Sequence, residues 1–496
     1  MSAPSGPRTA RIPGHALARL ACLLAIAGLA GCAGPQPPTY QSVRREFAAP
    51  AAQAVTAPDQ PAQAPDLSAP LDLRRAVRLA LTHSPGQEMA LMRIRQSEAM
   101  LDQALAAFLP MLSLYSEFSR GDVPSGYLFK TIDQRLLPPN TNFNGPGTFQ
   151  NWESGVRARW NLFHGGQDYL RRQMAQQGVE ISRLDRQALE NSLVASVIKA
   201  YYNCLAAGDF SRIAEQAEAT VAAQLRTMEV RQKGGGALLS DVLSLRVRLA
   251  QAREDLVRAR NTHRLALAAL ANLLGGDPDS ELDLVEGEGV EATVPPLYRE
   301  GVVEALERRP ELAKVRRQVV SARLALAAAR AEYLPRVDAQ GVYSWDDPLA
   351  QYSGERANYS YGLLVNWDVF TGLSTVKGAE KAKAALREVL AADRQAGLNI
   401  QLDVKSAYLN LAESLARLEV GRANLMSAEE AHRLVKRQYE GGAADVTRYL
   451  DAELNLNGAR VRAAAAEQDA RKARADIARA LGLWTPRAAK ELGRDD

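Results

Sequence analysis

Residues 160–166 read Trp-Asn-Leu-Phe-His-Gly-Gly, and the 67 residues that follow, 167–233, contain no proline. If that segment is one helix, it is roughly 100 Å long at about 1.5 Å per residue, far longer than a globular domain needs. Three consecutive glycines follow at 234–236. After them, apolar residues in 241–274 recur at alternating intervals of three and four, which predicts a second helix returning along the first. The stretch therefore predicts a long helical hairpin that begins where a strand ends.

The same pattern occurs a second time later in the chain. Pro85 and Pro110 recur 225 residues later as Pro310 and Pro335, and after a longer loop in the first copy the offset becomes 207. At that offset eight residues reappear without a gap: Trp160, Phe163, Ala200, Tyr201, Asn203, Gly235, Leu274 and Gly275 recur as Trp367, Phe370, Ala407, Tyr408, Asn410, Gly442, Leu481 and Gly482. A repeat of this length indicates an internal duplication of a whole structural unit.

The duplication defines the expected organisation of the chain. We expect a first unit at 71–276 and a second at 301–484, with a connector at 277–300 between them and a tail at 485–496. Helices are expected before each pair of strands, at 84–109 and 309–334, where they could stack end to end on the return helices. In the second unit the long helix is expected at 373–440 and the return helix at 448–481.

Two short segments of each unit alternate between apolar and polar residues, as strands with two different faces do. The expected strands are 111–119, 152–162, 337–345 and 359–369. Their length of about nine to eleven residues, with aromatic residues near the ends, suits a tilted strand across a bilayer. A soluble sheet with one wet face would show the same alternation. No apolar run after residue 31 approaches the roughly 20 residues of a membrane helix, so any crossing must use strands.

Four strands cannot close a barrel, and open sheet edges are not tolerated in lipid, so the chain must oligomerise. Two copies would give eight strands with a filled interior, whereas three would give twelve strands and an aqueous lumen. The polar face carries Glu117, Glu153, Arg157, Arg159 and Asp338, which suits the wider barrel. The expected fold is a mainly α-helical α+β membrane protein with four transmembrane strands per chain.

The first 31 residues read as a secretory signal that ends in Leu29-Ala30-Gly31-Cys32, with arginines before an apolar run. The last four residues look like a bacterial lipobox, so we expect Cys32 to carry a covalent lipid, with no other cofactor. Residues 32–70 are rich in Pro and Ala and predict an extended tether. Loss of three signal arginines lowers the formal net charge from +4 to +1, which gives no reason to expect nucleic acid as a partner.

With its motifs in this order, the chain from 71 to 484 resembles the TolC-like outer membrane efflux protein family, in particular its lipidated branch. The motifs are Phe108-Leu109-Pro110 and Tyr333-Leu334-Pro335 before strands, Trp160-Asn161-Leu162-Phe163-His164-Gly165-Gly166 and Trp367-Asp368-Val369-Phe370-Thr371-Gly372 after them, and hairpin turns at 235–243 and 439–453. The resemblance implies a homotrimer with a twelve-stranded barrel continued by a twelve-helix tunnel. It also implies an exit duct that docks on a periplasmic adaptor and an inner-membrane pump, usually of the resistance-nodulation-division class.

The resemblance further implies that the hairpin turns bind the adaptor. The residues concerned are Gly235, Ser240, Asp241, Val242, Gly442, Asp445 and Leu450. Adding the offset of 207 to Asp241 gives Arg448, where many relatives carry an acidic or uncharged residue. We hypothesise that Asp241 and Arg448, with Asp445 and Tyr449, form polar links that hold the tunnel tip shut. Solvated charges on a turn are the alternative interpretation.

Other functions fit the sequence less well. The histidines are scattered and His-Glu-x-x-His, Cys-x-x-Cys and phosphate-loop motifs are absent, so we expect neither an enzyme nor a metal site. A lipid-anchored periplasmic coiled coil would explain the helices and Cys32 but not four amphipathic strands. Within the duct interpretation, type I protein secretion is the alternative to small-molecule efflux, and the sequence does not name the cargo.

Overall fold

The computed structural model describes residues 65–67, 69–285 and 293–484. The expected signal, Cys32, nearly all of the tether and the tail at 485–496 lie outside these residues. The described chain divides into two compact units. The first consists of residues 100–175 and 323–383 and contains the sheet, whereas the second consists of 65–99, 176–322 and 384–484 and contains most of the helices.

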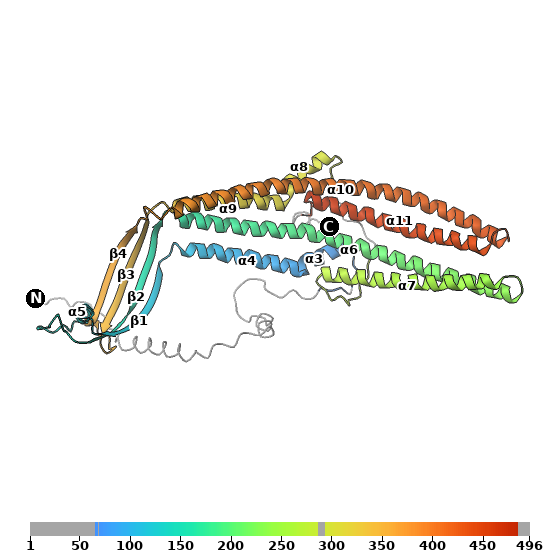
Figure 1. The fold of residues 1–496 in the computed structure, drawn as a ribbon. Helices are drawn as coiled ribbons and strands as arrows, with labels where there is room; N and C mark the ends of the chain where they lie inside the picture. The colour runs from blue at the N-terminus through green and yellow to red at the C-terminus, as the bar shows by residue number, and fades with distance from the viewer. Residues whose placement is uncertain (1–64, 68, 286–292, 485–496) are drawn as a thin grey trace, which may run out of the picture. The chain divides into compact units, whose positions relative to one another are not determined.

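The sheet has four antiparallel strands in the order β1-β2-β3-β4. The strands are β1 (Met111–Gly121), β2 (Phe149–His164), β3 (Arg336–Asp347) and β4 (Ala357–Asn366) (Figure 1). A short helix, α5 (Pro124–Asp133), lies in the connection between β1 and β2, and the 3₁₀ turn η1 (Gly354–Arg356) lies between β3 and β4. The sheet thus combines one strand pair from each half of the duplication.

The register of the sheet confirms the predicted alternation. Glu117 lies opposite Glu153 on β2, which lies opposite Asp346 on β3, so polar residues share one face across three strands. On the other face, Leu114 lies opposite Val156, which lies opposite Tyr343. Because side chains alternate between faces along each strand, one face of the sheet is polar and the other is apolar and aromatic.

β1, β2 and β3 extend one to three residues beyond their predicted ends, whereas β4 ends three residues earlier than predicted. β4 ends at Asn366, so Trp367, expected inside the strand, follows it. Its indole Nε1 donates to the Tyr333 carbonyl at 3.0 Å, just as Trp160 Nε1 donates to the Phe108 carbonyl at 2.9 Å in the first copy. The two tryptophans therefore tie each strand exit to the preceding helix end, and the duplication extends to individual hydrogen bonds.

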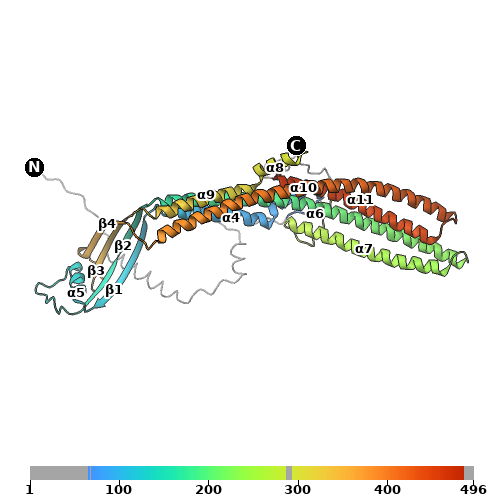
Figure 2. The ribbon, with the colours of Figure 1, turned by 45° about the horizontal axis from the view of Figure 1, so that its top comes forward.

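The helices follow the predicted hairpins (Figures 1 and 2). The long helices α6 (Gln167–Lys233) and α10 (Ser374–Glu440) have 67 residues each. Their return helices are α7 (Leu239–Leu273) and α11 (Val446–Leu481). The shorter helices α4 (Pro85–Ala106) and α9 (Pro310–Ala331) precede β1 and β3. None of the helices in the described part of the chain has the length and apolar character needed to cross a membrane.

Besides α5, two further α-helices were not predicted, namely α3 (Leu73–His83) and α8 (Tyr298–Arg308). The second begins inside the segment expected to be a connector, 277–300. The end of α3 meets the end of α7, because a Cβ on Gly275 would run into the His83 carbonyl, and Gly482 lies similarly close to Arg309. Both glycines have positive φ, +80° and +76°. These two contacts place the start of α4 beside the end of α7 and the start of α9 beside the end of α11. The predicted end-to-end stacking requires this arrangement.

The core of the second unit lies where α3, α6, α7 and α11 meet. Tyr201 is 1% exposed there, and its hydroxyl donates to the backbone carbonyls of Leu71 and Val285 at 3.2 Å and 2.5 Å. Cys204 and Trp484 belong to the same cluster. Burial raises the pKa of Cys204 to about 12, so its thiol stays protonated, as expected for a small apolar filler.

Candidate functional site

The two hairpin turns are built alike. Gly235 and Gly442 have φ of +78° and +77°, a left-handed conformation that favours glycine. Next to them, the amide of Gly236 donates to the Arg231 carbonyl at 2.8 Å and the amide of Ala443 donates to the Gln438 carbonyl at 2.7 Å. These bonds satisfy carbonyls at the ends of α6 and α10. Both glycines therefore mark the ends of the long helices.

The residues after the turns differ between the two copies. The Asp445 carboxylate accepts from the Arg448 backbone amide at 2.8 Å and thereby caps α11. The equivalent cap of α7 is Leu238, which offers no side-chain acceptor. Both return helices begin two residues earlier than predicted, so Ser240 and Asp241 lie in the first turn of α7. There the Asp241 carboxylate is favourably placed for the helix dipole.

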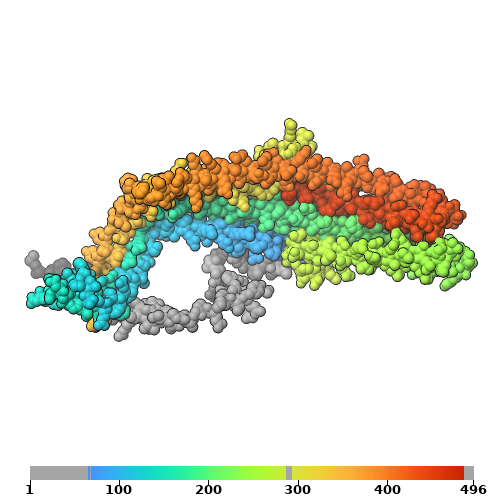
Figure 3. Space-filling view, viewed as in Figure 1, coloured from blue at the N-terminus to red at the C-terminus, as the bar shows by residue number. Residues whose placement is uncertain are grey.

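The hairpin ends share a small apolar core, and they lie side by side in two views of the ribbon (Figures 1 and 2) and in the space-filling view (Figure 3). Val242 and Leu245 of α7 pack in one buried cluster with Val446 of α11 and with apolar residues of α6. Leu450 packs against this cluster from its edge. Val242 and Leu450, predicted as adaptor contacts, are thus partly or wholly committed to packing inside the protomer.

Tyr449 lies at the centre of the second hairpin end. Its ring is 2% exposed and stacks on Tyr439 with ring centroids 5.1 Å apart, and its hydroxyl accepts from Gln224 Nε2 at 3.4 Å. Burial, reinforced by Glu453, raises the pKa of Tyr449 to about 12. His432 Nε2 lies 2.7 Å from a Glu453 carboxylate oxygen beside this ring. No sequence pattern pointed to that pair, because the two residues lie on different helices.

The predicted polar links fall into two groups. Tyr449 is held within the protomer, and Asp445 is used as a helix cap. Arg448 is exposed and Asp241 is half-buried, and within the described residues of one chain their side chains form no ion pair. A link between Asp241 and Arg448 therefore stays a prediction about contacts between copies of the chain.

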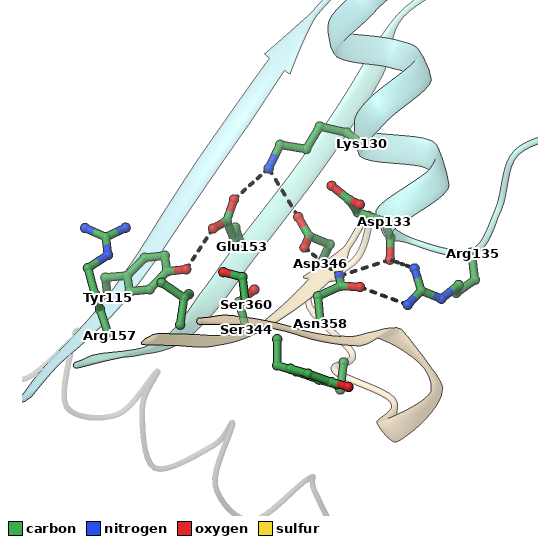
Figure 4. A pocket seen from close by; sticks show the side chains of 13 residues that line it. Tyr115, Lys130, Asp133, Arg135, Glu153, Arg157, Ser344, Asp346, Asn358 and Ser360 are labelled. Carbon is green, nitrogen blue, oxygen red and sulfur yellow. Dashed lines mark hydrogen bonds and ion pairs between the residues drawn. The ribbon is translucent and has the colours of Figure 1, made fainter. Parts of the chain in front are cut away.

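A second polar site lies on the sheet, under α5 (Figure 4). Lys130 Nζ of α5 lies 2.6 Å from Glu153 Oε2 and 3.2 Å from Asp346 Oδ1. Asp346 also accepts from Asn151 Nδ2 at 2.7 Å and from Asn358 Nδ2 at 3.0 Å. A cavity of about 560 Å³ opens beside this network. Glu153 was predicted to lie on the polar face of the sheet, whereas α5 and its Lys130 were not predicted.

A four-stranded sheet with one polar and one apolar face, combined with two helical hairpins of this length, defines the α+β channel class. The chain belongs to the outer membrane efflux protein family, whose family model matches residues 76–276 and 301–483. The chain is therefore an outer membrane exit duct for efflux or secretion, which confirms the predicted family, fold class and location.

Named relatives and solved structures agree with this assignment. The pyoverdine export outer membrane protein OpmQ of Pseudomonas putida is 26% identical, over 94% of this chain and 97% of the relative. The alkaline protease secretion protein AprF of Pseudomonas aeruginosa is also 26% identical, over 77% of each chain. The Campylobacter jejuni CmeC outer membrane channel has the same fold, with a TM-score of 0.72 at 16% identity over 85% of this chain and 88% of that one. These proteins are exporters and channels rather than enzymes.

Proposed function

We propose that three copies of this chain form the outer membrane duct of a tripartite efflux system. The observation that carries the proposal is a sheet with one polar face, one apolar face and two edge strands, β1 and β4, each of which pairs on one side only within the described part of the chain. Pairing of β4 with β1 of the next copy would satisfy both edges, place the apolar face in lipid and turn the polar face toward a lumen.

The proposed partners are a periplasmic adaptor and an inner-membrane pump, most often of the resistance-nodulation-division class in this branch of the family. The hairpin end of α6 and α7 supports adaptor docking, because Leu238, Leu239 and Leu243 are all at least half exposed there. Apolar side chains at an exposed turn suit a protein contact better than solvent. The turn glycines, Gly235 and Gly442, would give both hairpin ends the same shape for that contact.

Small molecules are the proposed cargo. The relative OpmQ is named for the export of pyoverdine, which supports this class of substrate. Protein secretion is the second candidate, because AprF is named for the secretion of a protease. The lipid anchor on Cys32 and the polar links at the tip, formed by Asp241 and Arg448 of neighbouring hairpins, are further parts of this proposal.

The test is planar-bilayer conductance of the detergent-extracted protein, with the oligomeric mass determined in the same preparation. A trimer that gives discrete channels of low conductance supports the proposal. A well-folded monomer without channels would overturn the trimeric duct and favour the lipid-anchored coiled coil. Export of a labelled small molecule and of a secreted protease by cells that lack this chain then decides between the two cargo classes.

A further inference from the structure

The helix α5 lies over the polar face of the sheet, at the end away from the long helices. The chain shows why: α4 and α6 join one end of β1 and β2, and the connection that holds α5 joins the other end. Lys130, on α5, reaches Glu153 on β2 and Asp346 on β3, both on the polar face (Figure 4). The sheet therefore lies between α5 and anything that contacts the apolar face.

Polar contacts hold α5 against the sheet, together with the ring of Phe149, which lies against Gly126. Besides the Lys130 ion pairs, Gln134 Nε2 donates to the Asn151 side chain at 2.8 Å, and Arg135 Nη2 donates to the Asn358 side chain at 2.9 Å. Thr131 is the one buried residue of α5, at 8% exposed. Gln134, Asn151 and Asp346 are 2%, 0% and 3% exposed, so these contacts are shielded from solvent and fix the position of α5 on the sheet.

The opposite side of α5 is apolar and faces away from its own sheet. Phe129 and Ile132, three residues apart on one face of the helix, are 63% and 42% exposed. This arrangement is the reverse of an ordinary surface helix, which buries its apolar side and exposes its charges. In α5, Lys130 contacts the sheet and Phe129 is exposed. The apolar side of this helix therefore needs a partner outside its own sheet.

We infer that α5 is an apolar exit gate, in which Phe129 and Ile132 of three copies face one another across the mouth of the duct. The inference rests on the proposed function, because it requires the polar face of the sheet to line a lumen. In that assembly the sheet would separate α5 from lipid, and the apolar side of α5 would face the lumen, toward the α5 helices of the other two copies. Apolar constrictions close a pore to ions by excluding water from it, and the Lys130 ion pairs hold each helix in the closed position.

Cross-linking tests the placement of α5. The full-length Phe129→Cys variant is treated with a bismaleimide. The matched control is the full-length Leu114→Cys variant, whose new cysteine lies on the apolar face of β1. Cys204 is buried and protonated, so the wild-type protein, treated in the same way, measures the background level of cross-linking. A monofunctional maleimide first verifies that both introduced thiols react. We expect covalent dimers from the Phe129→Cys variant and none from the Leu114→Cys variant. If the Phe129→Cys protein is trimeric but none of its chains is cross-linked, the gate is overturned while the proposed duct is not. A monomeric preparation would overturn both.

Conductance tests the gating. The double variant Phe129→Ser with Ile132→Ser is expected to raise single-channel conductance several-fold, whereas Leu349→Ser, an equally exposed apolar residue between β3 and β4, is not. Lys130→Met keeps the length of the side chain and removes its charge, and is expected to make full openings more frequent. Conductance and opening frequency equal to wild type in all three variants would refute the gate even if the protein forms normal channels.

Discussion

Asp403 holds together the start of α9 and the end of α11. Its carboxylate accepts from Arg309 Nη1 at 2.5 Å and from Arg479 Nη2 at 3.0 Å. The Arg309 side chain is 9% exposed and has Glu311 as its second partner, with Nη2 and Oε1 2.9 Å apart. We therefore predict that Asp403→Asn destabilises the second unit, because a largely buried guanidinium loses one of its two charged partners.

The size of the effect follows from burial. Removing one partner of a fully buried pair costs about 3–5 kcal/mol. Asp403 is 32% exposed and Arg309 retains Glu311, so we expect about 1–2 kcal/mol after allowing for solvent screening. If the pair is intact in the folded state and lost in the unfolding transition state, irreversible thermal unfolding becomes about tenfold faster for each 1.4 kcal/mol. Tryptophan fluorescence at fixed temperature measures this rate.

The pH dependence gives the same prediction a second test. Burial alone would raise the pKa of Asp403, but hydrogen bonds and charge from Arg479 and Arg309 outweigh it and lower the pKa. The stabilisation is therefore complete above the ordinary carboxyl pKa of about 4 and is lost as the pH falls through the lower folded value. The rate difference between Asp403→Asn and wild type should be constant near neutral pH and shrink in acid. Asp451→Asn, at an exposed position of α11, is the control; equal unfolding rates for the two variants at neutral pH would refute the reasoning.

The remaining predictions concern the hairpin ends and the lipid. Arg448→Ala should raise single-channel conductance if polar links close the tip, and unchanged conductance would rule those links out. Gly442→Ala places a Cβ at positive φ, which costs about 1–2 kcal/mol; proteolysis at the turn should become faster, whereas Gly397→Ala in α10, with open space around its Cβ, should have no such effect. Cys32→Ala should abolish incorporation of labelled palmitate and weaken retention in the outer membrane; labelling equal to wild type would contradict the lipobox interpretation.

The parts of the fold with long-range sequence periodicity could be predicted. The bounds of α6, Gln167–Lys233, agree with the prediction because the Gly165-Gly166 step and the glycines after Lys233 mark both ends. The strands were found by alternation, but β4 ends at Asn366, three residues before the predicted end. Alternation in sequence continues past that point, so no local signal revealed the end of the strand.

The contacts made by short elements could not be predicted. The ten residues of α5 begin with a proline at the first position of the helix. Their apolar side faces away from the protein, so the expectation that a helix buries its apolar side does not reveal α5. The role of Asp445 was also ambiguous, since a capping carboxylate and a gating carboxylate occupy the same kind of turn. Only the distance to the Arg448 amide identifies the cap.

The free edges of β1 and β4 bear on how the protein is made. Among the residues that the structure describes, a single chain leaves a row of backbone donors and acceptors unpaired along each edge, and in hydrocarbon each such group carries a large energetic penalty. If three copies form the proposed duct, a lone copy would have no favourable state inside a membrane, and insertion and assembly would become one event whose rate depends on how many copies are present. A chain whose edge is blocked, for example by a proline in the middle of β4, would still offer a sound β1 edge to a normal neighbour and would trap it in an incomplete ring. Defective copies would then inactivate normal ones in the same cell.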